Sequence, residues 1–173
     1  MIDQKYYTGI PAFFHYYFDL LVSDNLMAEF ARSSRITNDL IQKIPVEKEN
    51  FSYAPGKWTT KEVIRHIIDC ERIYVYRAFR FSRFDNTPLP GFDEDLFIEN
   101  LKGIEFSLSD LEEEFESVRK STLSLYKHLT DKMLDFEGSA NQVAFTARKI
   151  GFMIVGHNLH HCNFIETNYL GIS

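Results

Sequence analysis

One stretch near the C-terminus decides how the chain folds: Ile150-Gly151-Phe152-Met153-Ile154-Val155-Gly156-His157-Asn158-Leu159-His160-His161. Three of the six histidines lie in this apolar run, which contains no proline and is therefore typical of a helix. Because successive helical side chains step by about 100°, His157 and His161 lie only about 40° apart on one face. The two imidazoles can therefore reach one metal ion together.

The neighbours of the two histidines indicate which way they point. Apolar side chains flank them within about 60° on the helical wheel, whereas His160 points about 80° away from Ile150, the centre of this face. A single histidine on an apolar face is usually a core residue, but two of them double the number of buried rings that need partners. This pattern favours metal binding, although two ligands do not complete a zinc site.

Composition limits the classes of protein that the chain can belong to. With 173 residues and 45% hydrophobic content, residues 1–173 are expected to form a single domain with a sizeable core. The net charge of -6 gives no reason to expect nucleic acid. We also expect no membrane partner, because the sequence shows neither a signal peptide nor a spanning segment. The only two cysteines, Cys70 and Cys162, favour reduced thiols in a cytoplasmic protein.

Helical spacing of apolar residues and N-cap signals predict four long helices. The expected starts are Ser23 or Asp24, a capping box of Thr59 and Glu62, Ser107 or Ser109, and Thr146. Residues 84–108 form a long connection with a short helix around residues 95–100, which would let the second and third long helices run parallel. No strand pattern competes, so the predicted fold class is all-α: a four-helix bundle with a long crossover between helices two and three.

The second long helix carries a further group of candidates. His66 falls at the border of its apolar face, a placement that suits either a cavity lining or the surface. Asp69 and Cys70 follow at the third and fourth positions, where they could support a ligand or substrate. Their alternatives are an ordinary solvated ion pair for Asp69 and simple packing for Cys70. Elsewhere, His15 is expected to be structural and His128 exposed.

Several motifs together resemble the DinB-like metalloprotein superfamily over residues 53–170. They are Tyr53-Ala54-Pro55-Gly56-Lys57-Trp58-Thr59, His66-Ile67-Ile68-Asp69 with Glu71-Arg72, Tyr76-Arg77-Ala78, Arg80-Phe81, Thr87-Pro88-Leu89-Pro90-Gly91-Phe92-Asp93-Glu94 and Gly156-His157-Asn158-Leu159-His160-His161. The resemblance implies a four-helix bundle whose second helix provides one histidine and whose fourth provides a His-x-x-x-His pair. In this sequence those residues are His66, His157 and His161. Cys70 stands where the family pattern leads us to expect threonine.

The same resemblance implies a zinc or nickel protein, commonly a homodimer, with some relatives acting as transferases or isomerases on low-molecular-weight thiols. The first functional hypothesis is therefore a metal-dependent enzyme with an open three-histidine site, either a thiol-dependent transferase or a hydrolase with a small-molecule substrate. Asp69 could orient a ligand or water, and Arg77 or Arg80 could meet an anionic substrate. The alternative is a non-catalytic, metal-stabilised dimeric binding or sensor protein of the stress response. A third reading, in which the histidines bind no metal, stays open.

Overall fold

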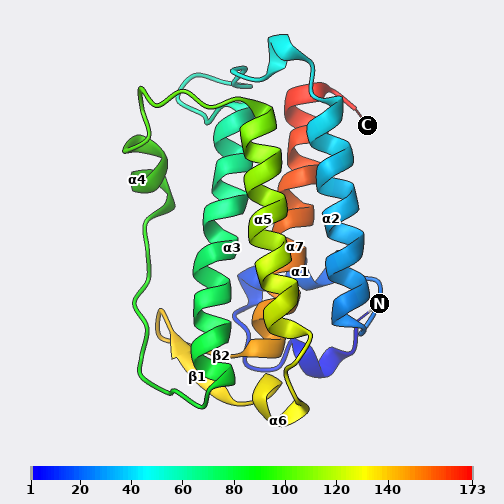
Figure 1. Cartoon of the computed structure of the whole chain (residues 1–173), viewed down its shortest axis with the longest axis vertical. Coiled ribbons are helices and arrows are strands. Elements are labelled where there is room, and N and C mark those ends of the chain that lie inside the picture. The colour runs from blue at the N-terminus through cyan, green and yellow to red at the C-terminus, as the bar shows by residue number, and fades with distance from the viewer. Residues whose placement is uncertain (1, 173) are drawn as a thin grey trace.

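Four long helices form the bundle, as the computed structural model of the chain shows for residues 2–172 (Figure 1). They are α2 (Leu26–Lys43), α3 (Thr60–Ser82), α5 (Leu108–Tyr126) and α7 (Ala147–Ile165). In the view of Figure 1 the chain runs up α2 and down α3, crosses back, runs down α5 and returns up α7. Helices α3 and α5 are therefore parallel, and the predicted four-helix bundle with a long crossover is confirmed.

The helix starts follow the cap chemistry of the sequence. At α3 the Thr59 hydroxyl accepts from the Glu62 amide, and the Glu62 carboxylate accepts from the Thr59 amide, so the predicted capping box is present. Ser107 caps α5 and Thr146 caps α7, both as predicted. At α2 the cap is Asn25, just after the two residues that the sequence suggested, because its side chain reaches the third amide of the helix.

Short elements connect and cover the long helices. The crossover between α3 and α5 contains α4 (Glu94–Glu99), close to the short helix expected there. The N-terminal segment folds into short turns that lie against the bundle, with Pro11 between the first two of them. The other short elements are the 3-10 turns Gln4–Tyr6, Ala12–Phe14 and Val46–Lys48, the helices α1 (His15–Asp19) and α6 (Asp131–Leu134), and a π-helical end at Glu166–Leu170.

The expectation of no strands was wrong for one short segment. Strands β1 (Glu137–Ala140) and β2 (Val143–Thr146) pair as an antiparallel hairpin. Asn141 and Gln142 turn the chain with φ of 50° and 64°, the left-handed conformation that a tight hairpin turn requires. Leu89 of the crossover makes two backbone hydrogen bonds to this hairpin: its amide donates to the Ser139 carbonyl, and its carbonyl accepts from the Asn141 amide. The crossover is thereby attached to the hairpin.

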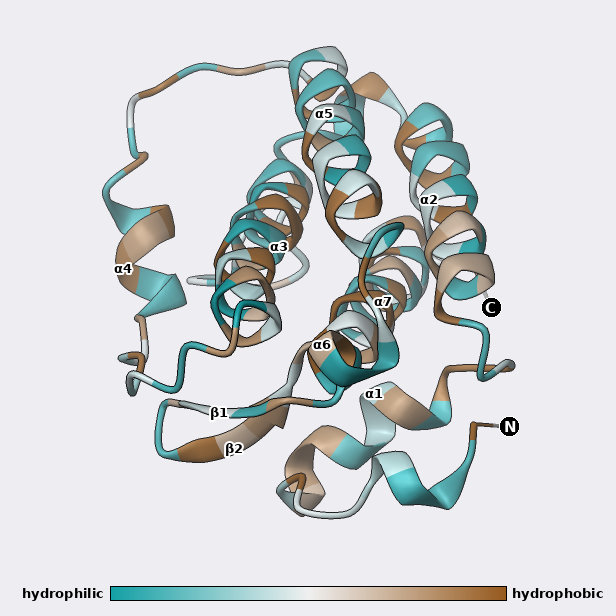
Figure 2. Ribbon diagram, turned by 60° about the horizontal axis from the view of Figure 1, so that its bottom comes forward, coloured by the Kyte–Doolittle hydropathy of each residue, from teal (hydrophilic) through white to brown (hydrophobic). Residues whose placement is uncertain are grey.

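Apolar faces of the four helices point inward, as the hydropathy colouring shows (Figure 2). Helix α7 lies at the centre of this packing, against α3 on one side and α2 on the other. The N-terminal segment packs directly on α7: a Cβ on Gly156 would lie 2.3 Å from the Tyr17 carbonyl oxygen, so only glycine allows this approach. This contact places the aromatic side chains of α1 beside the histidines of α7. Across residues 2–172, no helix combines the length and apolar character needed to cross a membrane.

Candidate metal centre

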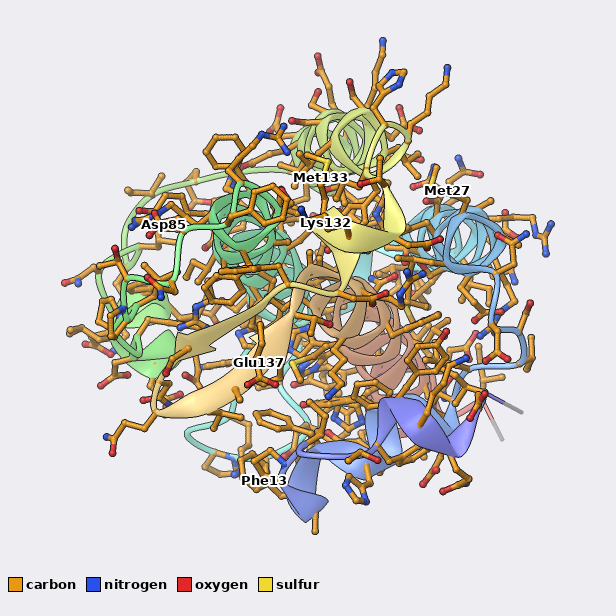
Figure 3. The ribbon with its side chains drawn as sticks, turned by 90° about the horizontal axis from the view of Figure 1, so that it is seen from below. Phe13, Met27, Asp85, Lys132, Met133 and Glu137 are labelled. Atoms are coloured by element: carbon orange, nitrogen blue, oxygen red, sulfur yellow. The ribbon has the colours of Figure 1, made fainter. Side chains whose placement is uncertain are left out.

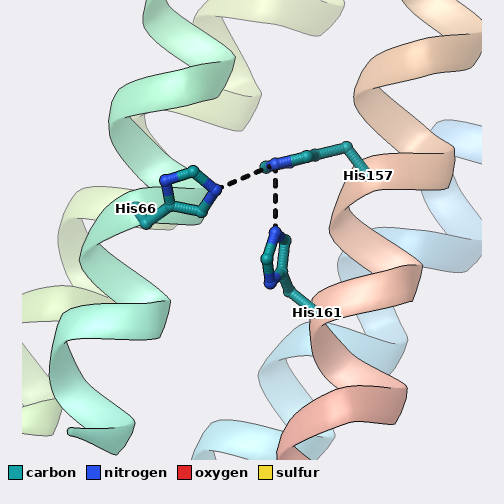
Figure 4. Close-up of side chains that lie close together, drawn as sticks. All are labelled: His66, His157 and His161. Atoms are coloured by element: carbon teal, nitrogen blue, oxygen red, sulfur yellow. Dashed lines mark hydrogen bonds between the residues drawn. The ribbon is translucent and has the colours of Figure 1, made fainter. Parts of the chain in front are cut away.

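Three histidine side chains meet between α3 and α7 (Figure 4). His66 projects from α3, and His157 and His161 project from successive turns of α7. The Nε2 atom of His157 lies 3.0 Å from Nε2 of His66 and 3.1 Å from Nε2 of His161. Candidate ligand atoms of all three lie within 4.8 Å of one another, and no other such group of His, Cys, Asp or Glu occurs in residues 2–172. The structure thus brings together the three residues that the resemblance selected.

Hydrogen bonding among the rings does not account for this arrangement. A neutral imidazole nitrogen carries either one proton or one lone pair, so His157 Nε2 cannot make a full hydrogen bond to both neighbours. Nitrogens bound to one ion at about 2.0–2.1 Å lie roughly 3 Å apart, which matches the two observed separations. The donor set therefore fits a divalent metal ion.

Burial keeps the three rings neutral. His66 and His157 are 7% and 5% exposed, and His161 is partly buried. Burial, followed by the charge of His160, lowers the pKa of His66 to about 4. Burial and the neighbouring histidines also hold the pKa values of His157 and His161 well below the ordinary histidine range. Neutral imidazoles offer their lone pairs to a metal without first losing a proton.

Trp58 and Cys70 both contact His66 on the protein side of the cluster. The Trp58 ring lies against His66, with 4.9 Å between ring centroids. Cys70 Sγ lies 3.6 Å from His66 Nδ1 and 3.8 Å from His66 Nε2, so the thiol packs against the ring and does not take the place of the carboxylate or carbonyl that usually lies behind one nitrogen of a ligating histidine. Nδ1 of His161 is buried and lacks a partner among the described residues. His66 is therefore restrained by packing against Trp58 and Cys70, whereas the outer nitrogen of His161 has no hydrogen-bond partner among the described residues.

A cavity of about 510 Å³ opens from the cluster and runs between α3 and α7. The N-terminal segment and the hairpin lie along this side of the bundle when the molecule is viewed from below, with Phe13 and Glu137 marking the two (Figure 3). Most of the lining is aromatic or aliphatic. The lining residues are Phe13, Phe14, Tyr16, Tyr17, Trp58, His66, Cys70, Tyr74, Arg77, Gly91, Phe92, Glu94, Ala140, Asn141, Val143, Phe145, Ile150, Met153, His157 and His161.

The two predicted catalytic residues lie in different places. Arg77 lines the cavity, and its guanidinium donates to the Pro90 carbonyl at 2.8 Å. Asp69 is not part of the lining; its carboxylate pairs with Arg72 at 3.2 Å, which matches its alternative reading as an ion pair. Burial raises the pKa of Asp69, with Arg65 and Arg72 opposing that effect. Of these two residues, only Arg77 therefore lines the same cavity as the three histidines. A catalytic role for Asp69 stays a prediction.

The remaining histidines lie outside the cluster. His160 is partly exposed and makes edge contacts with the rings of Tyr16 and Tyr17, and it does not join the three. His15 bonds to the Ile10 carbonyl at 2.9 Å, consistent with a structural role. His128 is exposed, as expected. The helical wheel of α7 had placed His160 away from the face that carries His157 and His161, and in the structure His160 lies outside the cluster.

Sequence reasoning missed much of the cavity wall. Tyr74 follows His66 and Cys70 at helical spacing on α3, which was the available signal for it. Tyr17 and Asn141 reach the cavity from the N-terminal segment and the hairpin turn, which lie far from the histidines in the sequence. No local pattern could place these two, because their positions depend on how the segments pack against α7.

Comparison with known proteins agrees with this geometry. The family model of the DinB superfamily matches residues 29–165. The chain belongs to the DinB superfamily. A search of the curated proteins finds no match. The resemblance seen in the motifs is therefore confirmed at the level of the family.

Two solved structures share the fold of this DinB superfamily member. YfiT from Bacillus subtilis, described as a probable metal-dependent hydrolase with an unusual four-helix bundle topology, matches with a TM-score of 0.73 and 18% identity, covering 89% of this chain and 93% of YfiT. The DinB-like protein YjoA from Bacillus subtilis matches with a TM-score of 0.60 and 18% identity, covering 86% of this chain and 93% of YjoA. At this identity the likeness concerns the fold.

Proposed function

We propose that the protein is a divalent-metal-dependent enzyme in which His66, His157 and His161 hold the ion. The observation that carries the proposal is the convergence of three neutral imidazole nitrogens at one wall of a cavity. Three protein ligands leave a coordination position for substrate or water, whereas a structural zinc is normally closed by four. An ion held in this way supplies a Lewis acid that lowers the pKa of a water or thiol bound to it.

The residues around the cluster would prepare the site for such chemistry. Trp58 packs against His66 and Tyr17 packs against His157, which restrains the two rings. The Cys70 thiol is a poor nucleophile, because burial raises its pKa well above the ordinary cysteine value. A reacting thiol, if the reaction uses one, would therefore come from the substrate side.

Two reaction classes fit this site: thiol-dependent transfer and hydrolysis. The resemblance of the motifs implies relatives that act on low-molecular-weight thiols, which favours a thiol-dependent transferase. YfiT is described as a probable metal-dependent hydrolase, which favours hydrolysis. We place transfer first and hydrolysis second. Zinc or nickel is the proposed ion, since imidazole ligands suit both.

Metal content tests the proposal directly. Elemental mass spectrometry on untagged, dialysed protein should give near-stoichiometric zinc or nickel, and His161→Ala should remove it. His160→Ala is the matched control, because it deletes the adjacent imidazole, which lies outside the cluster, and should keep the ion. Metal-dependent turnover of a thiol with an electrophile, or of an ester, then separates the two reaction classes. Metal-free protein in all three samples, or turnover that survives complete metal removal, would contradict the proposal.

The second candidate is a non-catalytic binding or sensor protein stabilised by the metal. It is favoured by the position of the cluster, which joins α3 to α7, so that an ion would tie two helices of the bundle together. In this version the protein would be a cytoplasmic homodimer of the stress response. Bound metal that stabilises the fold, together with the absence of turnover in both assays, would favour it over the enzyme.

A further inference from the structure

Arg77 and Arg80 of α3 were both candidates for binding an anionic substrate, but only one of the two side chains is available to a ligand in the cavity. The Arg80 side chain is already paired: it bonds to the Asp85 carboxylate and to the Tyr76 hydroxyl. Arg77 is 8% exposed, lines the cavity and donates to one carbonyl, that of Pro90. Within residues 2–172 no carboxylate forms an ion pair with Arg77. A largely buried guanidinium without a counter-ion is therefore directed at the same cavity as the histidines.

The surroundings hold this guanidinium in a fixed orientation. Its Cζ lies 5.4 Å from the centroid of the Phe92 ring and 6.0 Å from that of Tyr74, and the bond to Pro90 fixes one edge. Pro90 itself lies in the crossover segment that Leu89 attaches to the hairpin. A planar, restrained guanidinium of this kind is suited to bind a carboxylate by donating two parallel hydrogen bonds to it.

Charge at this end of the cavity selects among anions. Glu94 lines the same cavity but does not pair with Arg77. The single guanidinium neutralises a monoanion, whereas a dianion such as a phosphate monoester would keep one uncompensated negative charge in a largely apolar cavity that Glu94 also lines. A carboxylate is therefore the group that fits.

The helix also sets the length of the ligand. His66, Cys70, Tyr74 and Arg77 form one stripe along α3 and all line the cavity. The Arg77 Cζ lies 6.0 Å from the Tyr74 ring centroid, and that centroid lies 5.8 Å from the His157 ring centroid, so the guanidinium lies within about 12 Å of the His157 ring. A molecule that touches both ends must be elongated, and its middle would lie against the rings of Tyr74 and Phe92 and the other apolar wall residues.

We propose that the cavity binds an elongated monocarboxylate with an apolar middle, whose carboxylate is held by Arg77 while its other end lies at the three histidines. The Arg77 subsite stands on its own geometry; the statement that the other end is the reacting end rests on the proposed metal-dependent function. In the thiol-transfer or hydrolysis reaction, Arg77 would be a substrate-binding residue that sets specificity.

A fluorescence titration tests the subsite. Trp58 is the only tryptophan of the chain and lines the cavity, so its emission reports binding there. The probes are 4-phenylbutanoate, its neutral isostere 4-phenylbutanamide and 3-phenylpropyl phosphate, each titrated into chelator-treated and into metal-loaded protein. Because a hydrogen bond to a charged group contributes about 1.5–3 kcal/mol, the carboxylate should bind roughly 10- to 150-fold more tightly than the amide. It should also bind more tightly than the phosphate.

Variants assign this preference to one residue. Arg77→Gln should reduce the ratio of carboxylate to amide affinity to near one, Arg77→Lys should keep part of it, and Arg80→Gln, the matched control one turn away, should keep all of it. Equal affinities in the native protein, no binding of any probe at millimolar concentration, or a ratio that survives in Arg77→Gln would overturn the proposal. The comparison of probes in the native protein decides the matter even if Arg77→Gln fails to fold.

The design also keeps this inference apart from the metal proposal. Carboxylate selectivity in chelator-treated protein tests Arg77 without any ion. Metal content of Arg77→Gln, which should equal that of the native protein, tests the histidines without the subsite. If the protein binds no metal, the carboxylate selectivity should still be observed. If the selectivity is absent, the metal content should still be near-stoichiometric.

Discussion

A buried ion pair in the bundle gives the sharpest prediction for stability. Glu71 of α3 and Arg119 of α5 are joined by two hydrogen bonds of 2.8 Å, and their side chains are only 2% and 3% exposed. Arg119 also donates to Ser33 and Ser34 of α2, and Glu71 accepts from Thr122. This network links three of the four long helices around one fully satisfied pair.

Replacing Arg119 by leucine should leave the Glu71 carboxylate buried with one hydroxyl as its partner. Breaking a buried pair from one side costs about 3–5 kcal/mol, because the remaining charge keeps its desolvation penalty. For a chain of this size, that loss corresponds to a fall in melting temperature of roughly 6–20 °C. Circular dichroism at 222 nm during thermal and urea unfolding at pH 7 measures both quantities.

The control for this experiment is Arg72→Leu, which removes an arginine of 45% side-chain exposure paired with Asp69 and Glu114. That change should cost less than about 1 kcal/mol, since exposed pairs contribute little. A deficit of Arg119→Leu below about 1 kcal/mol at pH 7 would refute the reasoning.

Four further predictions concern the site. Cys70→Ala should weaken metal affinity by less than about 10-fold, because the thiol packs against the His66 ring and does not hold one of its nitrogens in line; metal competition with a chromogenic chelator measures this. Metal-free protein should lose stability as pH falls from about 6.5 to 4, by about 3 kcal/mol from His66 alone, since its pKa is lowered in the folded state and protons then favour the unfolded chain; urea midpoints across this range check it. Metal at 100 times its dissociation constant should add about 3 kcal/mol to the free energy of unfolding, and a melting temperature unchanged by chelator would contradict this. Gly156→Ala should displace the Tyr17 backbone and destabilise the fold by more than 1 kcal/mol, which thermal unfolding would show.

The sequence was most informative where a signal is local. The capping box of Thr59 and Glu62, and the cap at Thr146, involve atoms three residues apart, so their chemistry can be read without knowing the fold. The apolar face of α7 is likewise a local pattern, and it separated His157 and His161 from His160. These signals predicted the four long helices and the histidine pair.

The sequence was least informative where tertiary packing decides. His66 lies at the border of the apolar face of its helix, and it is buried only because α3 packs against α7. The helical wheel could not identify it as a ligand, and the resemblance did. The hairpin was missed because its strands have only four residues each, too few for a period-2 pattern to stand out. Gly138 indicates why the hairpin fits there: a Cβ at this position would lie 2.2 Å from the Phe81 ring, so glycine lets the strand rest on α3.

The arrangement of the ligands suggests how metal affinity and fold stability are related. His157 and His161 belong to one helix, so their relative position survives as long as α7 is helical. His66 comes from an antiparallel neighbour, and its position depends on the packing of α3 against α7. Loosening that packing, for example through the Glu71 network on the other side of α3, should weaken metal binding without altering any ligand. Metal affinity of Arg119→Leu under native conditions would measure this coupling, and an affinity equal to that of the native protein would show that the α3–α7 contact is held independently of α5.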